Sequence, residues 1–98
     1  MPPDSRPQAA PQVQHQAEAS RFVVNTPQGL ALCSYHREGG TLVLPHTLVP
    51  PALEGRGIAA ALVKEALAWA RQEGLRVRPT CSYVAAYMQR HPETQDLL

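Results

Sequence analysis

Residues 54–59 (EGRGIA) form the part of the sequence best suited to hold an anion. Glycines let the backbone turn tightly and approach a ligand closely. The segment stands directly before a run of helix-forming residues, and the free amides and positive dipole end of a helix N-terminus attract groups such as a diphosphate. Arg56 can add a charge-assisted hydrogen bond. The spacing alone fits a plain glycine turn equally well, because neither a P-loop ending nor a third glycine of a dinucleotide loop is present.

Cys81 is the residue best suited to nucleophilic chemistry. It lies where a strand is expected to end and a helix to begin, and the helix dipole at such a junction lowers the pKa of a thiol. A cysteine thiolate can accept an acyl group and so divide a transfer into two steps. A small buried cysteine that only packs at the junction fits the same position. The other cysteine, Cys33, lies within a strand pattern and is expected to pack.

A series of short strands must position the glycine loop. Strands are predicted over residues 21–25, 30–35, 41–44 and 47–49, because β-branched and apolar residues alternate there with Pro- and Gly-rich turns. Pro45 lacks the N–H that a strand pairing needs, so an edge, a bulge or a bend is expected between the last two strands.

Two helices are predicted in the second half of the chain. Apolar residues from Ile58 to Ala70 cover about half of a helical wheel, and Gly74 stands where this helix should end. A strand over residues 75–80 follows, and then a helix over residues 83–91 that Ser82 caps. The resulting strand–helix–strand crossover should be parallel and right-handed, which gives an α/β fold.

The composition predicts one small domain. The chain has 98 residues, of which 17% are charged, and a net charge of +1, so neither nucleic acid nor a membrane surface is an expected partner. Residues 1–20 are rich in Pro, Gln and Ala and are expected to form a flexible tail, which leaves residues 21–98 as the folded domain. Two cysteines without metal-ligand spacing predict no metal site and favour a reduced, cytoplasmic location.

Residues 53–63 (LEGRGIAAALV) resemble motif A of the GNAT superfamily of acetyl-CoA-dependent N-acetyltransferases, Gln/Arg-x-x-Gly-x-Gly/Ala. Gly57 and Ala59 match its last two fixed positions, and Glu54 departs from the first. A subgroup of very small GNAT-like proteins resembles the chain further, over roughly residues 21–98. The shared patterns are His46-Thr47, Arg78-Pro79-Thr80-Cys81 and Arg90-His91-Pro92-Glu93.

The resemblance implies a truncated GNAT fold, in which a mixed, mainly antiparallel sheet carries a βαβ crossover and a C-terminal helix. It also implies that acetyl-CoA lies between the fourth and fifth strands, with its pantetheine arm on the backbone of Leu48 and Val49. Arg90 could reach a CoA phosphate or could simply be a solvated helix end. The amides implied for the pyrophosphate are those of Gly55, Arg56, Gly57, Ile58, Ala59 and Ala60.

The resemblance also implies acetyl transfer to an amine, and three residues are candidates for catalysis. Cys81 matches the cysteine proposed as a nucleophile in the small subgroup. Many GNAT enzymes carry a carboxylate base on the fourth strand, but Leu48 stands where relatives have an acid, so His46 becomes the candidate base. Tyr87 matches the general-acid tyrosine of the last helix better than Tyr83, with which it shares a helix face. Core packing is the alternative role for both tyrosines.

Two other functions fit the same residues. The chain is too short to contain the N-terminal helices that shape the acceptor pocket of full-length GNAT enzymes. It could therefore be a non-catalytic module that binds CoA or acyl-CoA, or a small interaction domain whose glycine loop is only a turn. The amine or protein acceptor is not readable from the sequence, and a homodimer or a larger complex could complete a shallow site.

Overall fold

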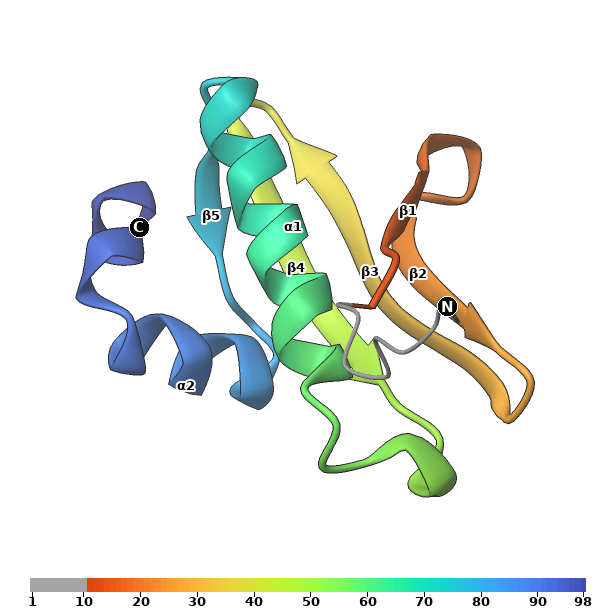
Figure 1. The fold of residues 1–98 in the computed structure, drawn as a ribbon. Coiled ribbons are helices and arrows are strands. Elements are labelled where there is room, and N and C mark those ends of the chain that lie inside the picture. The colour runs from red at the N-terminus through yellow and green to blue at the C-terminus, as the bar shows by residue number, and fades with distance from the viewer. Residues whose placement is uncertain (1–10) are drawn as a thin grey trace, which may run out of the picture.

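A five-stranded sheet forms the framework of the computed structural model, which describes residues 11–98 (Figure 1). Its strands are β1 (Gln14–Gln16), β2 (Arg21–Thr26), β3 (Gly29–Glu38), β4 (Thr41–Leu48) and β5 (Arg76–Arg78). The strands lie side by side in chain order. Neighbours run antiparallel except β4 and β5, which run parallel.

Within residues 11–98, two α-helices and three 3-10 segments complete the fold. They are α1 (Ile58–Gln72), α2 (Ser82–Arg90), η2 (Ala17–Ala19), η3 (Pro51–Leu53) and η4 (Pro92–Leu97). Helix α1 connects β4 to β5 and lies across one face of the sheet, as Figure 1 shows. The predicted α/β fold is confirmed, with its mixed, mainly antiparallel sheet, its crossover and its C-terminal helix.

Helix α1 packs on the sheet because its apolar residues return every three or four positions. Its buried side chains are Ile58, Leu62, Val63, Ala66, Leu67 and Ala70. They share one core with Phe22 of β2 and with Leu42 and Leu44 of β4. Full burial of a large aliphatic side chain contributes about 1.5–3 kcal/mol. Gly74 follows the helix with a φ of 70°, the left-handed conformation predicted for a helix end.

The expectation of a flexible tail over residues 1–20 is wrong for residues 14–16, which pair with β2 as strand β1. His15 accounts for this docking. Its ring stacks on Phe22 with centroids 4.2 Å apart, and its Nε2 lies 2.6 Å from the hydroxyl of Tyr35. Trp69 of α1 meets the same ring edge-on at 4.7 Å. These aromatic contacts offset the conformational entropy that the segment loses on docking. Its few aliphatic residues alone would not bury enough surface to do so. Residues 1–10 lie outside the described residues.

Strand β4 contains one residue more than the stretch of β3 that it pairs with. Val43 pairs with His36 and His46 pairs with Ser34, so three steps along β4 match two along β3. Pro45 lies in this bulge, and the two strands predicted on either side of it are one continuous strand. Because side chains alternate along a strand, the bulge decides which of the following residues face α1.

Strands β4 and β5 part at one end of the sheet. They pair only over Thr41–Val43 on the β4 side. One step farther, the backbone N–H of Cys81 donates to the carbonyl oxygen of Leu44 at 3.0 Å. Beyond this point β4 runs on to Leu48, while the chain after Cys81 turns into α2. The opening between them is the place where the family resemblance implies that acetyl-CoA lies.

Candidate functional site

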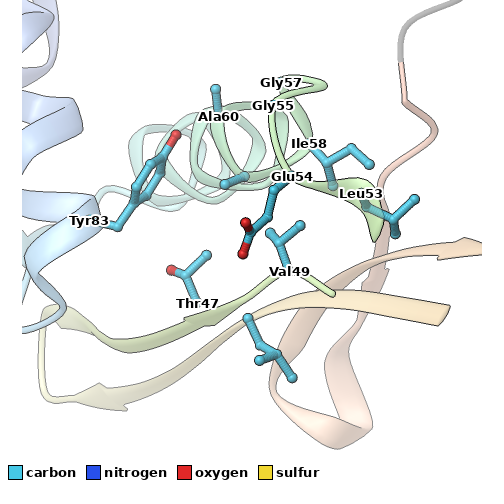
Figure 2. A pocket seen from close by; sticks show the side chains of 11 residues that line it. Thr47, Val49, Leu53, Glu54, Gly55, Gly57, Ile58, Ala60 and Tyr83 are labelled. Atoms are coloured by element: carbon cyan, nitrogen blue, oxygen red, sulfur yellow. The ribbon is translucent and has the colours of Figure 1, made fainter. Parts of the chain in front are cut away.

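A cavity of about 560 Å³ lies between the end of β4, the start of α2 and the N-terminus of α1 (Figure 2). The loop between η3 and α1 also lines it. A volume of this size is typical of sites for small molecules and cofactors. The lining residues are Thr47, Leu48, Val49, Leu53, Glu54, Gly55, Gly57, Ile58, Ala59, Ala60 and Tyr83.

The first turn of α1 presents free backbone amides to this cavity. Gly57 is the N-cap and has no side chain to cap the helix, and the first amide bonded back to it is that of Ala61, at 3.0 Å from the Gly57 oxygen. Within residues 11–98, the amides from Gly55 to Ala60 donate no hydrogen bond. Gly55 and Gly57 have φ values of 81° and 78°, which side chains rarely tolerate. The loop thus has the donors and the backbone shape of an anion site.

Glu54 opposes an anion in the same cavity. Its side chain points into the space below α1, toward the end of β4, as Figure 2 shows. This is the position at which the sequence departs from the Gln/Arg of motif A. The departure therefore places a negative charge inside the cavity instead of a neutral or positive donor.

Cys81 stands at one end of the cavity without lining it. Its sulfur lies 3.6 Å from Oγ1 of Thr47, which does line the cavity, and Tyr83 extends from α2 toward α1 at the same end (Figure 2). Cys81 itself is the N-cap of α2. The prediction that Ser82 caps this helix is wrong, because the helix begins one residue earlier than expected.

Burial raises the pKa of the Cys81 thiol, but several donors act against it and the net pKa lies below its ordinary value. The strongest of these donors is the backbone N–H of Val84, followed by the hydroxyl of Thr47 and the amides of Tyr83 and Thr47. Neither helix amide meets the geometry of a capping hydrogen bond. The start of α2 therefore favours the thiolate, as the sequence analysis predicts for a cysteine at this junction.

Cys33 has the opposite environment although it touches the same threonine. Its side chain is fully buried in the core, and Thr47 Oγ1 lies 3.9 Å from its sulfur. Burial raises the pKa of Cys33 to about 11, and the hydrogen bond from Thr47 offsets only part of this. Cys33 packs in the core, as predicted, but it is also connected through Thr47 to the cavity.

Several predicted site residues do not lie at the cavity. His46 pairs with Ser34, one position from the Cys33–Thr47 pair, so it projects from the sheet face opposite α1 and is exposed. Tyr87 is buried beside a smaller cavity of about 180 Å³ between α1, α2 and η4, where its ring stacks on His91 at 4.0 Å. Arg56 and Arg90 are exposed and line neither cavity.

The structure does bring most of the predicted cofactor-binding residues together. Leu48, Val49, Gly55, Gly57, Ile58, Ala59 and Ala60 all line the larger cavity. Leu53 and Tyr83 line the cavity although the sequence did not predict this, and Glu54 belongs to the predicted loop but was noted only as a departure from motif A. Thr47 was predicted only as part of the His-Thr pattern, although its register with Cys33 puts it on the cavity side of the sheet.

A family model described as GCN5-related N-acetyl-transferase matches residues 21–97. The chain belongs to this family. The chain is also similar to the protein NATD1 of Mus musculus, which is 37% identical over 100 residues, covering 98% of this chain and 91% of that protein. NATD1 of Homo sapiens is 38% identical over 88 residues, covering 87% of this chain and 78% of that protein.

A solved structure supports the same fold. The NMR solution structure of a GCN5-like protein from Staphylococcus aureus superposes with a TM-score of 0.71 at 21% identity, covering 88% of this chain and 85% of that one. GCN5-related N-acetyltransferases in general use acetyl-CoA. The unbonded amides and the apolar lining residues Leu53 and Ile58 fit that molecule, whereas the Glu54 carboxylate does not.

Among residues 11–98, no three His, Cys, Asp or Glu side chains are grouped to hold a metal ion. The same residues include no helix with the length and apolar content needed to traverse a bilayer.

Proposed function

We propose that this chain binds acetyl-CoA in the larger cavity and transfers the acetyl group to an amine by way of Cys81. The observation that carries the proposal is the set of unbonded amides from Gly55 to Ala60 at the rim of an apolar cavity that opens where β4 and β5 part. Family membership supplies the chemistry, since GCN5-related N-acetyltransferases share this reaction class.

Binding would use the two walls of the cavity differently. The amides of the α1 N-terminus would hold the diphosphate, and the exposed guanidinium of Arg56 can turn toward it. Within the described residues, Leu48 at the end of β4 and the following Val49 have no strand partner on the β5 side, so their backbone can pair with the amide groups of the pantetheine arm. Glu54 would weaken the binding by repelling the phosphates.

Cys81 would act as the acyl acceptor. Its thiolate attacks the thioester carbonyl carbon, a new carbon–sulfur bond forms, and the CoA thiolate leaves with the electron pair of the broken bond. A neutral amine then attacks acetyl-Cys81, the amide forms, and Cys81 leaves as the thiolate while the amine proton passes to solvent. The lowered pKa of Cys81 supports both steps, because a thiolate is the better nucleophile and the better leaving group.

Tyr83 is the residue we propose as proton donor to the leaving CoA thiolate, and it regains its proton from solvent before the next turnover. It lines the cavity at the end nearest Thr47, whereas Tyr87 lies beside the smaller cavity. Tyr87 is also a poor donor for another reason. Burial, Glu93 and Tyr83 all raise the pKa of Tyr87, which holds its proton more tightly.

The decisive experiment is incubation of the protein with acetyl-CoA followed by intact-mass analysis and peptide mapping. We expect a single acetyl adduct on Cys81, absent in Cys81→Ala and present in Ser82→Ala, a matched change at the exposed neighbouring residue. The adduct should disappear when a suitable amine is added. Acetylated amine without any adduct, in wild type and in Cys81→Ala alike, would establish direct transfer and contradict the covalent route.

Binding of CoA without turnover is the second candidate function. It is favoured by one observation, namely that His46 projects from the opposite face of the sheet and Leu48 occupies the position of the expected carboxylate, so β4 offers the cavity no side-chain base. Calorimetry separates the two functions. Saturable CoA binding combined with no adduct and no product across a panel of amines would support the binding module.

A further inference from the structure

Thr47 joins the two cysteines of the chain into one hydrogen-bonded row. The sulfur of Cys81 lies 3.6 Å from Thr47 Oγ1, and the same oxygen lies 3.9 Å from the sulfur of Cys33. The three residues come from different elements: Cys33 from β3, Thr47 opposite it on β4, and Cys81 from the N-cap of α2. The row therefore runs from the core of the sheet to the end of the cavity.

The hydrogens available in this row allow two directions of hydrogen bonding. A threonine hydroxyl has one proton and accepts with its lone pairs, and a thiol can donate weakly and accept weakly. While Cys81 is a thiol, it donates to Thr47 Oγ1 and the Thr47 hydroxyl donates to Cys33. When Cys81 loses its proton, the hydroxyl can rotate about its Cβ–Oγ1 bond and donate to the thiolate instead. Cys33, still a thiol, can then donate to Thr47.

We infer that Thr47 is a positioning residue, which together with Cys33 stabilises the Cys81 thiolate by reversing the direction of this hydrogen-bonded row. The role rests on the proposed function, because a stabilised thiolate serves acyl transfer. In either direction the row keeps two hydrogen bonds, one on each side of the Thr47 hydroxyl, and no new charge is placed in the core. The buried sulfur of Cys33 supplies what an alanine or a valine at that position would lack, a group able to accept in one state and donate in the other.

The ionisation behaviour of the two cysteines supports this row. Burial holds the pKa of Cys33 at about 11, so Cys33 keeps its proton throughout the range in which Cys81 ionises. The Thr47 hydroxyl is among the groups that lower the pKa of Cys81. Among the described residues, the titratable groups that line the neighbouring cavity are Tyr83 on α2 and Glu54 before α1. A hydrogen bond to an ionised group is about twice as strong as one between neutral groups, so the row favours the thiolate.

The test measures the ionisation of Cys81 in the absence of acetyl-CoA. The rate of alkylation by iodoacetamide is followed against pH by intact mass, with Cys81→Ala as the blank. Thr47→Val keeps the shape and the backbone N–H but removes the hydroxyl, and should move the midpoint of the rate profile up by about 0.5–1 pH unit. Thr47→Ser keeps a hydroxyl and should restore the wild-type midpoint. Circular dichroism checks that each variant is folded.

An unchanged midpoint in folded Thr47→Val would overturn the inference. So would equal shifts in Thr47→Val and Thr47→Ser, since packing alone would then account for both. If Thr47→Val does not fold, Cys33→Ala and Cys33→Ser test the inference from the other end of the row. The alanine variant should shift the midpoint of the alkylation profile upward, and the serine variant should shift it less. Equal midpoints in the two variants would contradict the inference.

Failure of the proposed function gives a different result. Calorimetry on the same samples would then show no CoA binding, while the alkylation midpoints would still differ between Thr47→Val and Thr47→Ser. Loss of the midpoint difference with CoA binding intact would refute the inference alone.

Discussion

The two helices begin in different ways, although the physics at both N-termini is the same. Helix α1 starts from Gly57, which has no side chain, and its amides stay open to the cavity. Helix α2 starts from Cys81, whose sulfur lies against its own amides. Free N–H groups and a positive dipole end thus stay open to the cavity in α1, whereas in α2 they lower the pKa of the protein's own thiol. The residue at the N-cap makes the difference.

Cys33 extends this comparison, because its sulfur contacts Thr47 as that of Cys81 does but lies within β3 and not at a helix N-terminus. Its pKa of about 11 lies above the ordinary value of 9.0, chiefly because of burial. Above pH 9.0 the unfolded chain loses this proton while the folded chain keeps it, so stability is full below pH 9.0 and falls as pH rises toward 11. The free energy of unfolding should fall by about 3 kcal/mol over this pH range.

The measurement is denaturant unfolding at about pH 8 and about pH 11 in the Cys81→Ala background, with and without Cys33→Ala. The difference between the two chains cancels the other titrating groups. A pH dependence that is the same with and without Cys33 would mean that the core around β3 admits the thiolate, and the contrast between the two cysteines would not hold.

Gly57→Val should disturb the backbone at the N-terminus of α1 and so weaken CoA binding there. The substitution forces a β-branched residue into a φ of 78° and adds methyl groups beside the amides. We expect CoA affinity to fall about tenfold or more, a larger effect than the loss of folding stability, because strain of this kind costs about 1–3 kcal/mol and the ligand also loses its donors.

Gly39→Val is the matched control for this prediction. Gly39 has a φ of 61°, lies in the turn at the other end of β4, and like Gly57 has open space where a Cβ atom would stand. The control variant should lose a similar amount of stability and keep its CoA affinity unchanged. Calorimetry that finds equal affinity losses in the two variants would indicate global strain instead of a local anion site.

Glu54→Gln should increase the affinity of the cavity at the α1 N-terminus for CoA. It removes the carboxylate that points into the cavity and restores a residue type that motif A prefers. CoA should bind about 3–10-fold more tightly at low salt, and the gain should shrink as salt screens the repulsion. Glu65→Gln, the same change at an exposed position of α1, should have little effect. A gain of similar size in both variants would reflect net charge alone.

The sequence predicted the parts of the fold that depend on local patterns. The α1 stripe from Ile58 to Ala70, the glycine loop before it and the parallel crossover all follow from spacing and turn residues. The residues of this loop were singled out from the same local pattern, and the resemblance to motif A added the remaining cofactor-binding candidates. Each of these features is decided by residues that are close neighbours in the chain.

The misplaced residues depend on features that act over a longer range. One extra residue at Pro45 reverses the alternation in β4, so His46 faces away from the cavity and Thr47 faces toward it. A helix start one residue earlier than expected makes Cys81 the N-cap of α2. Neither spacing nor composition says which of Tyr83 and Tyr87 faces the cavity, because that depends on how α2 packs against α1 and η4.

Cys81→Ser tests the smallest difference between the two helix ends. Serine is among the best N-cap residues, since its hydroxyl accepts hydrogen bonds from helix amides more strongly than a neutral thiol does. At neutral pH the variant should gain about 0.5–1 kcal/mol in stability by urea unfolding and form no acetyl adduct that survives turnover conditions. Cys81→Ala should lose the contact between the sulfur and Thr47 and form no adduct. If Cys81→Ser instead lowers the free energy of unfolding as much as Cys81→Ala does, the hydroxyl cannot replace the sulfur at this N-cap. The contacts of the Cys81 thiolate with Thr47 and with the α2 amides would then account for the stability that both variants lose.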